Sequence, residues 1–359
     1  MCQSNYLEIS RTALRHNAAA VCKAVRVPII GIVKCNGYGV TICEAASAWQ
    51  SAGVTMFGVS RPEEALELRK NRFCEDILLL SPVADTQTLT EMLDNNVILT
   101  VSGFENAKFY SNSASKTPVR VHLAVDTGMG RFGIRWSDAA QASAVYSLPG
   151  LCCEGIFSHF ASSFEPIYQK TKIQLSRFLR LTETLRAEGI SVGMRHIANS
   201  CAALRFPETH LDAVRIGSAL VGRLHVSVPI KLESVSIFKA QIVDLKSFQP
   251  GDTTGYGGYF KIKKQTKAAV VALGQEDGFG SVAKPDKLRF RDFAAYLFHL
   301  FKEWRQPHCV VCDGQKLAVL GRIGNQYTLF DATGADINLG DLVEWDGNLM
   351  LSSCERRFI

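Results

Sequence analysis

The chain has 359 residues, 47% of them hydrophobic, and a formal net charge of +6. This length is enough for one large α/β domain and a smaller second domain, and the hydrophobic content is ordinary for a globular protein. No apolar run reaches the roughly 18 to 20 residues of a membrane span. The mild positive charge favours anionic ligands without indicating nucleic acid. We therefore expect neither a membrane nor a nucleic-acid partner.

The amino-terminal residues and the cysteines bear on location. Residues 1–5 read MCQSN and lack the charged-then-apolar pattern of a signal peptide. The eleven cysteines show no regular spacing, which is typical of reduced thiols and predicts a cytoplasmic protein. Cys309 and Cys312 form a lone C-x-x-C, which fits half a zinc site or a redox pair. Because the second half of such a site is missing, no metal is expected.

Short β-branched runs alternate with helical patterns over the first two-thirds of the chain. The expected strands are 29–33, 56–59, 77–80, 97–101, 120–125, 155–157, 196–198 and 213–216. Helical patterns fall between most of them, including one that begins at Pro62 and an amphipathic one over 174–188. Eight strands alternating with helices fit a (β/α)8 TIM barrel or a large doubly wound sheet, and the count of eight favours the barrel.

Closely spaced strands follow from about residue 232 and predict a small, mostly antiparallel β domain. They are expected at 235–245, 256–260, 267–273, 309–311, 317–323, 326–331 and 342–345. Pro229 lies in the boundary, so the barrel is assigned to 1–228 and the β-rich domain to 229–359.

One helical insertion is predicted near 285–305 within the β-rich domain. Residues 288–304 carry aromatic and leucine side chains at helical spacing, with basic residues at the start. Such a helix fits packing on the protein itself or at a dimer interface, or binding to a membrane surface or a partner.

Lys34 directly follows the apolar run 29–33 and precedes Asn36 and Gly37 of a predicted tight turn. In a β/α barrel the carboxyl end of a strand belongs to the catalytic rim. A lysine there is costly to desolvate unless its charge or its amine is used, and this suits Schiff-base chemistry. The alternative is a lysine that extends its amine into solvent at a strand end.

Polar residues also follow later strands of the predicted barrel. They are Arg131 in the glycine-rich segment 126–133, His159, Asn199, Ser200, Arg215, Gly217 and Ser218. Hydroxyls and free backbone N–H groups at strand ends are what a phosphate at the carboxyl face of a barrel needs. Each segment alone also fits an ordinary βα turn. Together on one barrel rim, they indicate a binding site.

These motifs resemble those of the fold-type III alanine racemases, which depend on pyridoxal 5'-phosphate (PLP), and the resemblance covers nearly all of the chain. VKCNGYG at 33–39 resembles V-K-A-N-A-Y-G, whose lysine holds PLP as an internal aldimine. Residues 125–133 match V-D-T-G-M-G-R-x-G, and HFA at 159–161, ANS at 198–200 and VRIG at 214–217 resemble H-F-A, A-N-S and V-R-P-G. The cofactor-binding residues that the resemblance implies are Lys34, Tyr38, Arg131, His159, Asn199, Ser200, Arg215, Gly217 and Ser218.

The resemblance also implies a function and an assembly. The chain is expected to be a PLP-dependent racemase that interconverts L- and D-amino acids, nominally alanine, through Lys34. It is expected to form a homodimer in which each β-rich domain completes the active site of the other chain. The resemblance also predicts that the protein binds a small amino acid as its substrate.

The β-rich domain departs from the family pattern at two positions. The second catalytic base of the family is the tyrosine of G-Y-x-D-G-Y, and Gln275 stands in its place because 274–279 reads GQEDGF. Asn325 replaces the substrate-contacting methionine of G-R-V-S-M-D, which leaves Arg131 and Asn325 as the substrate-binding candidates. An amide does not titrate near neutral pH, so Gln275 is no general base. Lys34 can serve one face of the substrate Cα, and the neighbouring Glu276 is a candidate for the other.

Two classes of function fit these changes. The first is an amino-acid racemase with an altered second base. The second is a PLP-binding relative with changed chemistry, either a decarboxylase or lyase that uses Lys34 alone, or a non-catalytic PLP protein. The cofactor-side residues are all retained, so the racemase is the prediction.

Overall fold

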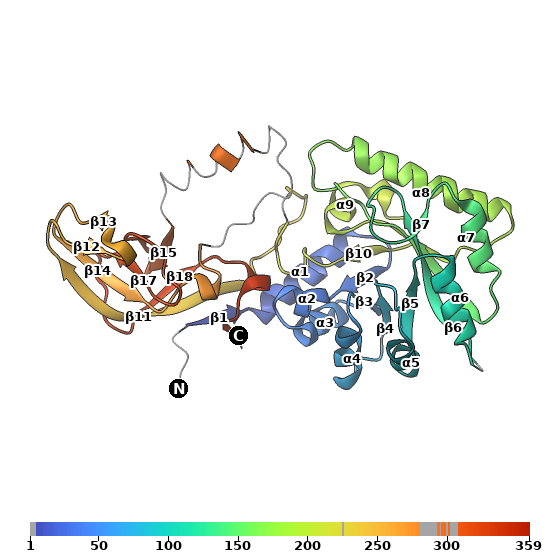
Figure 1. Ribbon diagram of the computed structural model, residues 1–359, viewed down its shortest axis with the longest axis horizontal. Helices are drawn as coiled ribbons and strands as arrows, with labels where there is room; N and C mark the ends of the chain where they lie inside the picture. The colour runs from blue at the N-terminus through green and yellow to red at the C-terminus, as the bar shows by residue number, and fades with distance from the viewer. Residues whose placement is uncertain are drawn as a thin grey trace. The chain divides into compact units, whose positions relative to one another are not determined.

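A computed structural model describes residues 5–115, 117–224, 226–280, 293–294, 296–298, 301 and 308–359. The chain divides into two compact units, Arg11–Val235 and Met1–Ser10 together with Ser236–Ile359. The amino-terminal segment belongs to the second unit because β1 (Asn5–Ile9) pairs antiparallel with β11 (Ser236–Phe248) and parallel with β19 (Glu355–Phe358). Both units can be followed in Figure 1 by their labels.

The first unit is a closed parallel barrel. Its strand order is β10-β2-β3-β4-β5-β6-β8-β9, and the short β7 (Ile134–Arg135) pairs with β6. A parallel bridge between His196 and Ala213 joins the last strand to the segment before the first and closes the ring. The barrel strands are β2 (Ile29–Ile32), β3 (Met56–Val59), β4 (Asp76–Leu79), β5 (Val97–Val101), β6 (Val119–Asp126), β8 (Leu151–Phe157), β9 (Met194–His196) and β10 (Val214–Ile216). All eight expected strands are present, and the barrel rather than the doubly wound sheet is confirmed.

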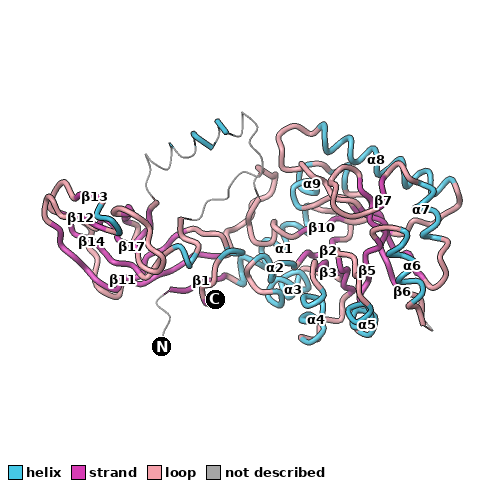
Figure 2. Tube along the Cα trace, in the orientation of Figure 1, coloured by secondary structure: helices cyan, strands magenta, loops and turns pink. Residues whose placement is uncertain are grey.

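Helices surround these strands (Figure 2). Every residue of β2, β3 and β5 is buried, as expected for parallel strands that are covered on both faces. One apolar cluster comprises Ile30, Ile32, Met56, Leu78 and Ile98. The helical segments are α1 (Arg11–Ala24), α2 (Lys34–Tyr38), α3 (Ile42–Ser51), α4 (Pro62–Lys70), α5 (Thr86–Asp94), α6 (Phe104–Asn112), α7 (Ala139–Tyr146), α8 (Gln169–Ala187), α9 (Ser200–Arg205) and η1 (Pro207–Thr209).

The second unit is built from antiparallel strands. The order β14-β17-β16-β15-β18-β11 closes on itself because β14 also pairs with β11, and β1 and β19 extend the sheet beyond β11. Only the β1–β19 pairing is parallel among the described strands of this unit. The further elements are β12 (Thr253–Thr254), β13 (Phe260–Lys261), β14 (Thr266–Val271), β15 (Cys309–Cys312), β16 (Gln315–Val319), β17 (Thr328–Asp331), β18 (Leu342–Trp345), η2 (Tyr256–Gly258), η3 (Gln275–Asp277) and η4 (Leu349–Leu351).

The prediction of a strand over 256–260 is wrong. Residues Tyr256–Gly258 form a 3-10 turn, and β13 begins only at Phe260. Gly255, Gly257 and Gly258 have φ values of 73°, 77° and 61°, a region that interrupts a strand. The helix expected over 288–304 lies largely outside the described residues. Within the described part of the chain, no helix is long and apolar enough to cross a membrane.

Cys309 and Cys312 occupy the two ends of β15. Residues three apart on a strand point to opposite faces, and accordingly Cys309 is exposed whereas Cys312 is buried. The C-x-x-C spacing therefore does not make a chelating or redox pair here.

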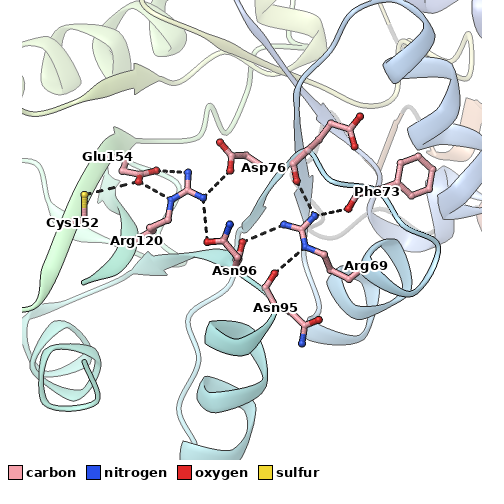
Figure 3. A network of polar contacts seen from close by, with 9 residues as sticks. Arg69, Phe73, Asp76, Asn95, Asn96, Arg120, Cys152 and Glu154 are labelled. Carbon is pink, nitrogen blue, oxygen red and sulfur yellow. Dashed lines mark hydrogen bonds and ion pairs between the residues drawn. The ribbon is translucent and has the colours of Figure 1, made fainter. Parts of the chain in front are cut away.

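An ionic network ties together the amino-terminal ends of the barrel strands (Figure 3). Arg120 on β6 donates to both carboxylate oxygens of Glu154 on β8, at 2.7 and 2.9 Å, and to Asp76 on β4 at 2.8 Å. Arg69 on α4 donates at 2.9 Å to the backbone oxygen of Asn95, which precedes β5. These contacts join four neighbouring strands at the end of the barrel where the strands begin.

The substitution Arg120→Met tests this network. It leaves two carboxylates without their shared guanidinium, so we expect the free energy of unfolding to fall by about 2 kcal/mol. Urea titrations followed by circular dichroism measure the loss. Lys108→Met is the control, since Lys108 makes an exposed pair with Glu105 and lies over the ring of Phe104, and it should cost less than about 1 kcal/mol. Equal losses in the two variants would contradict the proposed contribution of the network to the free energy of unfolding.

Candidate functional site

A pocket of about 420 Å³ opens at the carboxyl ends of the barrel strands. This volume lies within the range of small-molecule sites. Its lining includes every cofactor-binding residue that the sequence predicted, namely Lys34, Tyr38, Arg131, His159, Asn199, Ser200, Arg215, Gly217 and Ser218. The barrel thus brings together residues that are spread over more than 180 positions of the sequence.

The pocket also contains residues that the sequence analysis missed. Ser60 and Ser81 follow β3 and β4, and Phe157 ends β8. The same reasoning that identified Lys34, a polar side chain directly after a buried strand, identifies both serines when it is applied to every strand of the barrel.

Arg215, the middle residue of β10, is only 4% exposed and lies at the base of the pocket. Its Nη2 donates to the backbone oxygens of Ser158, at 2.5 Å, and Ile197, at 3.3 Å. Its Nη1 donates to the backbone oxygen of His196 at 3.0 Å and to Nδ1 of the same residue at 2.7 Å. A second imidazole, that of His159, lies 3.2 Å from Nη2 through its Nδ1. The buried charge is therefore surrounded by acceptors.

These contacts set the protonation of three histidines. A guanidinium can only donate, so Nδ1 of His196 and Nδ1 of His159 accept and carry no proton. Nε2 of His196 then holds its proton and donates to Nδ1 of His122 at 2.8 Å. Burial, reinforced by nearby arginine charges, lowers the pKa of His122 and of His159 to about 3, and that of His196 well below its ordinary value. Burial also lowers the pKa of Arg215, to about 9, so at neutral pH the arginine is charged and the three rings are neutral.

Asp126 shapes the glycine-rich loop that carries Arg131. One of its carboxylate oxygens, Oδ1, accepts from the backbone N–H groups of Gly128, Met129 and Gly130 at 2.9 to 3.0 Å. Although burial opposes it, these hydrogen bonds lower the pKa of Asp126. Asp126 therefore holds a loop rather than capping a helix, and the loop places the exposed Arg131 on the wall of the pocket.

Gln174 on α8 connects this loop to the one after β8. Its Nε2 donates to Oγ1 of Thr127 and to the backbone oxygen of His159, both at 3.1 Å. Its Oε1 accepts from the N–H of Ala161 at 2.9 Å. Gln174 is only 4% exposed, so these contacts are shielded from water and fix the two loops against each other.

One corner of the pocket is rich in groups that can donate to an anion. Ser200 begins α9, and its hydroxyl accepts from the N–H of Gly217 at 3.0 Å, which leaves the hydroxyl proton available. Tyr38 lies so close to Gly217 that a Cβ on that glycine would collide with the phenol ring and its oxygen. Asn199 caps α9 through its side chain, which accepts from the N–H of Ala202 at 3.1 Å. Hydroxyls and N–H groups at a helix start are suited to a phosphate.

The remaining predicted residues belong to the second unit. Gln275 and Glu276 lie on the turn η3, and their N–H groups donate to the backbone oxygens of Gly324 and Asn325 at 3.0 and 3.1 Å. The structure therefore brings Gln275, Glu276 and Asn325 to one place within that unit. The side chains of all three are exposed, and Oε2 of Glu276 accepts from Nε2 of Gln326 at 3.0 Å.

The chain is similar to known proteins over nearly its whole length. The family model for the alanine racemase N-terminal domain matches residues 9–225, and that for the C-terminal domain matches 235–353. An alanine racemase from Desulfosudis oleivorans is 36% identical, with 95% of this chain and 86% of the relative covered. An amino-acid racemase from Enterococcus faecalis is 32% identical over 78% of this chain and 41% of its own length. The solved alanine racemase of Clostridium difficile 630 superposes with a TM-score of 0.88 at 23% identity, covering 100% of this chain and 96% of its own, which shows the shared fold.

The buried histidines predict a loss of stability in acid. Below about pH 6.5 the unfolded chain binds protons at His122 and His196 that the folded barrel excludes. The free energy of unfolding should therefore be unaffected by these groups above this pH. It should fall as the pH decreases toward about 3, by up to about 1.4 kcal/mol per pH unit for each histidine.

Urea unfolding of the wild type and of His122→Asn between about pH 7 and about pH 5 measures this dependence. His122→Asn should remove one histidine's share of the slope. A wild-type free energy that does not change over this range would show that the histidines protonate without cost.

Proposed function

The chain belongs to the alanine racemase family and is an amino-acid racemase, and we propose that it uses PLP held by Lys34 to interconvert the two enantiomers of alanine or a similarly small amino acid. The observation that carries the cofactor proposal is the pocket, in which an amine, a buried guanidinium and a corner of hydroxyl and N–H donors face one cavity. The relatives reported above carry racemase names, which favours this activity over the decarboxylase or lyase alternative.

The side chains that line the pocket have the functional groups that PLP requires. Lys34 is the only lysine among the described residues that line the pocket, and a primary amine is what a PLP aldehyde requires. The phosphate is assigned to Ser200, Tyr38 and the backbone at Gly217 and Ser218, where the absence of a Cβ on Gly217 lets the Tyr38 phenol lie against the backbone. Arg215 is assigned to the ring nitrogen, where its fixed charge disfavours a proton. The remaining assignments are Arg131 to an oxygen of the cofactor or the substrate carboxylate, and His159 and Asn199 to the walls around the ring.

The chemistry of racemisation divides between cofactor and protein. When bound, PLP withdraws electron density from the substrate amino acid, which makes its Cα proton acidic. Lys34 removes and returns that proton on one face of Cα. If Arg215 faces the ring nitrogen, its charge would disfavour a proton on that nitrogen, and the unprotonated ring would withdraw electrons less strongly, which would suit proton exchange over transamination.

The opposite face of Cα requires a second acid–base group. We assign this region to Gln275, with Asn325 as a substrate contact, although Gln275 itself cannot exchange a proton near neutral pH. Glu276 has the required carboxylate, and its contact with Gln326 is an exposed one that can be broken. Racemisation is therefore limited at the second face.

We propose that two copies of the chain form a homodimer, in which the β-rich unit of each copy completes the site of the other. The support is that the candidate residues for the second face belong to the second unit, whereas the pocket is lined by the first. Apolar side chains are exposed at and beyond the rim of the barrel, including Met129, Phe132, Phe164 and Ile167, and such residues are typical of a surface that another protein covers.

The substitution Lys34→Ala tests the cofactor assignment. It removes the amine that PLP requires, so the visible absorbance of bound PLP should be lost. Absorbance spectra after incubation with PLP and removal of the free cofactor measure this. Lys172→Ala, on α8 and outside the pocket, should retain the full signal. A wild-type protein that takes up no PLP would refute the proposed cofactor.

Gln275→Tyr tests the second face. In deuterated water, wild-type protein should introduce deuterium at Cα of one alanine enantiomer faster than it inverts that enantiomer, because only Lys34 exchanges protons. Gln275→Tyr should raise the rate of inversion by about a hundredfold or more, as measured by mass spectrometry and chiral chromatography. Wild-type inversion at about 10 per second or faster would contradict a limiting Gln275. Loss of that inversion in Glu276→Gln would then identify Glu276 as the second base.

A further inference from the structure

The segment after Lys34 has an unusual backbone. Cys35, Asn36, Gly37 and Tyr38 have consecutive φ values of 56°, 52°, 64° and 56°. This left-handed conformation is favourable for glycine but costs free energy for residues that carry a Cβ. Three of the four residues carry one, so the turn does not form on local preference alone. Other contacts must hold it.

One of those contacts comes from α4. The N–H of Cys35, the first amide after Lys34, donates to Oε1 of Glu64 at 2.6 Å. Farther along the turn, Oδ1 of Asn36 accepts from the N–H of Ile42, the first residue of α3, at 3.0 Å. The Glu64 contact therefore attaches the first amide of the turn, that of Cys35, to a second helix, α4.

The other oxygen of the same carboxylate holds the neighbouring loop. Oε2 of Glu64 accepts from the N–H of Ser60 at 2.8 Å and from the N–H of Arg61 at 3.1 Å. Ser60 follows β3 and lines the same pocket as Lys34. Glu64 lies in the first turn of α4, where the helix dipole favours a negative charge. A single carboxylate thus joins the rim segments after β2 and β3.

We propose that Glu64 is a positioning residue that holds the amine of Lys34 at the cofactor pocket by fixing the left-handed turn behind it. The inference rests on the proposed role of Lys34 in holding PLP. With the turn fixed, the backbone of Lys34 is already in place when the cofactor arrives, so binding does not have to order it. Glu64 does not line the pocket, and it acts through the backbone of Cys35.

The substitution Glu64→Gln provides a sharp test because both oxygens of Glu64 accept from N–H groups. A glutamine has one oxygen, and its NH₂ group would face an N–H on one side. Glu63→Gln is the matched control. Glu63 is exposed in the same first turn of α4, so this change removes the same charge from the same end of the same helix.

Two readouts separate positioning from general stability. The first is the dissociation constant of PLP for the apoprotein, measured by fluorescence titration. The second is hydrogen–deuterium exchange of the backbone in the apoprotein, followed for the peptide that contains residues 34–39. Glu64→Gln should weaken PLP binding about tenfold or more and accelerate exchange in that peptide while peptides from β5 and β6 stay protected. Glu63→Gln should change the dissociation constant by less than about twofold.

Each other outcome decides against the proposal or against its premise. Wild-type PLP affinity in Glu64→Gln overturns it, whether or not exchange is faster. Equal weakening in Glu63→Gln shows an effect of charge alone and also overturns it. If Glu64→Gln loses protection throughout the barrel, Glu64→Asp replaces it, since a shorter carboxylate cannot span both loops and should again weaken binding. If the wild type takes up no PLP, the proposed function fails, and the exchange data alone show whether Glu64 holds the turn.

Discussion

The barrel depends on one buried charge. Arg215 lies on the strand that closes the ring, and its guanidinium donates to backbone oxygens at the ends of β8 and β9. A buried charge of this kind is stable only when every donor finds an acceptor. The contacts that satisfy Arg215 are therefore also contacts that join three neighbouring strands at the rim where the pocket opens.

The same charge determines the electrostatics of the pocket floor. Since a guanidinium only donates, the imidazoles beside it must be neutral acceptors, and one proton remains for each ring. His196 donates its proton to His122, which is also buried. The result is a row of groups in which only the arginine is charged at neutral pH. A ligand atom placed against Arg215 thus meets a fixed positive charge that no neighbouring histidine can reinforce.

The fold and most of the pocket can be predicted from the sequence because buried parallel strands have a recognisable apolar pattern. The β-branched runs such as 97–101 are buried on both faces, which the sequence pattern predicts directly, and Lys34 follows such a run. The strand expected over 256–260 is instead a turn, because the glycines at 255, 257 and 258 have positive φ values that interrupt a strand. Glu64 and Gln174 were missed for another reason. Their roles depend on which backbone groups they meet across loops, and a helical sequence pattern records only that they fall on helices.

The loops of the first unit depend on side-chain hydrogen bonds, whereas the turn at Gln275 in the second unit depends on backbone hydrogen bonds. In the barrel, the side chains that hold the loops cannot be replaced without loss of hydrogen bonds. Glu64 accepts through both carboxylate oxygens, and Gln174 uses both the oxygen and the nitrogen of its amide. In the second unit, backbone hydrogen bonds hold the turn of Gln275 against Asn325. Backbone contacts of this kind do not depend on side-chain identity, so positions 275 and 325 can change without loss of the turn. A fold built in this way keeps the pocket side chains of the first unit in place while positions 275 and 325 of the second unit are free to vary.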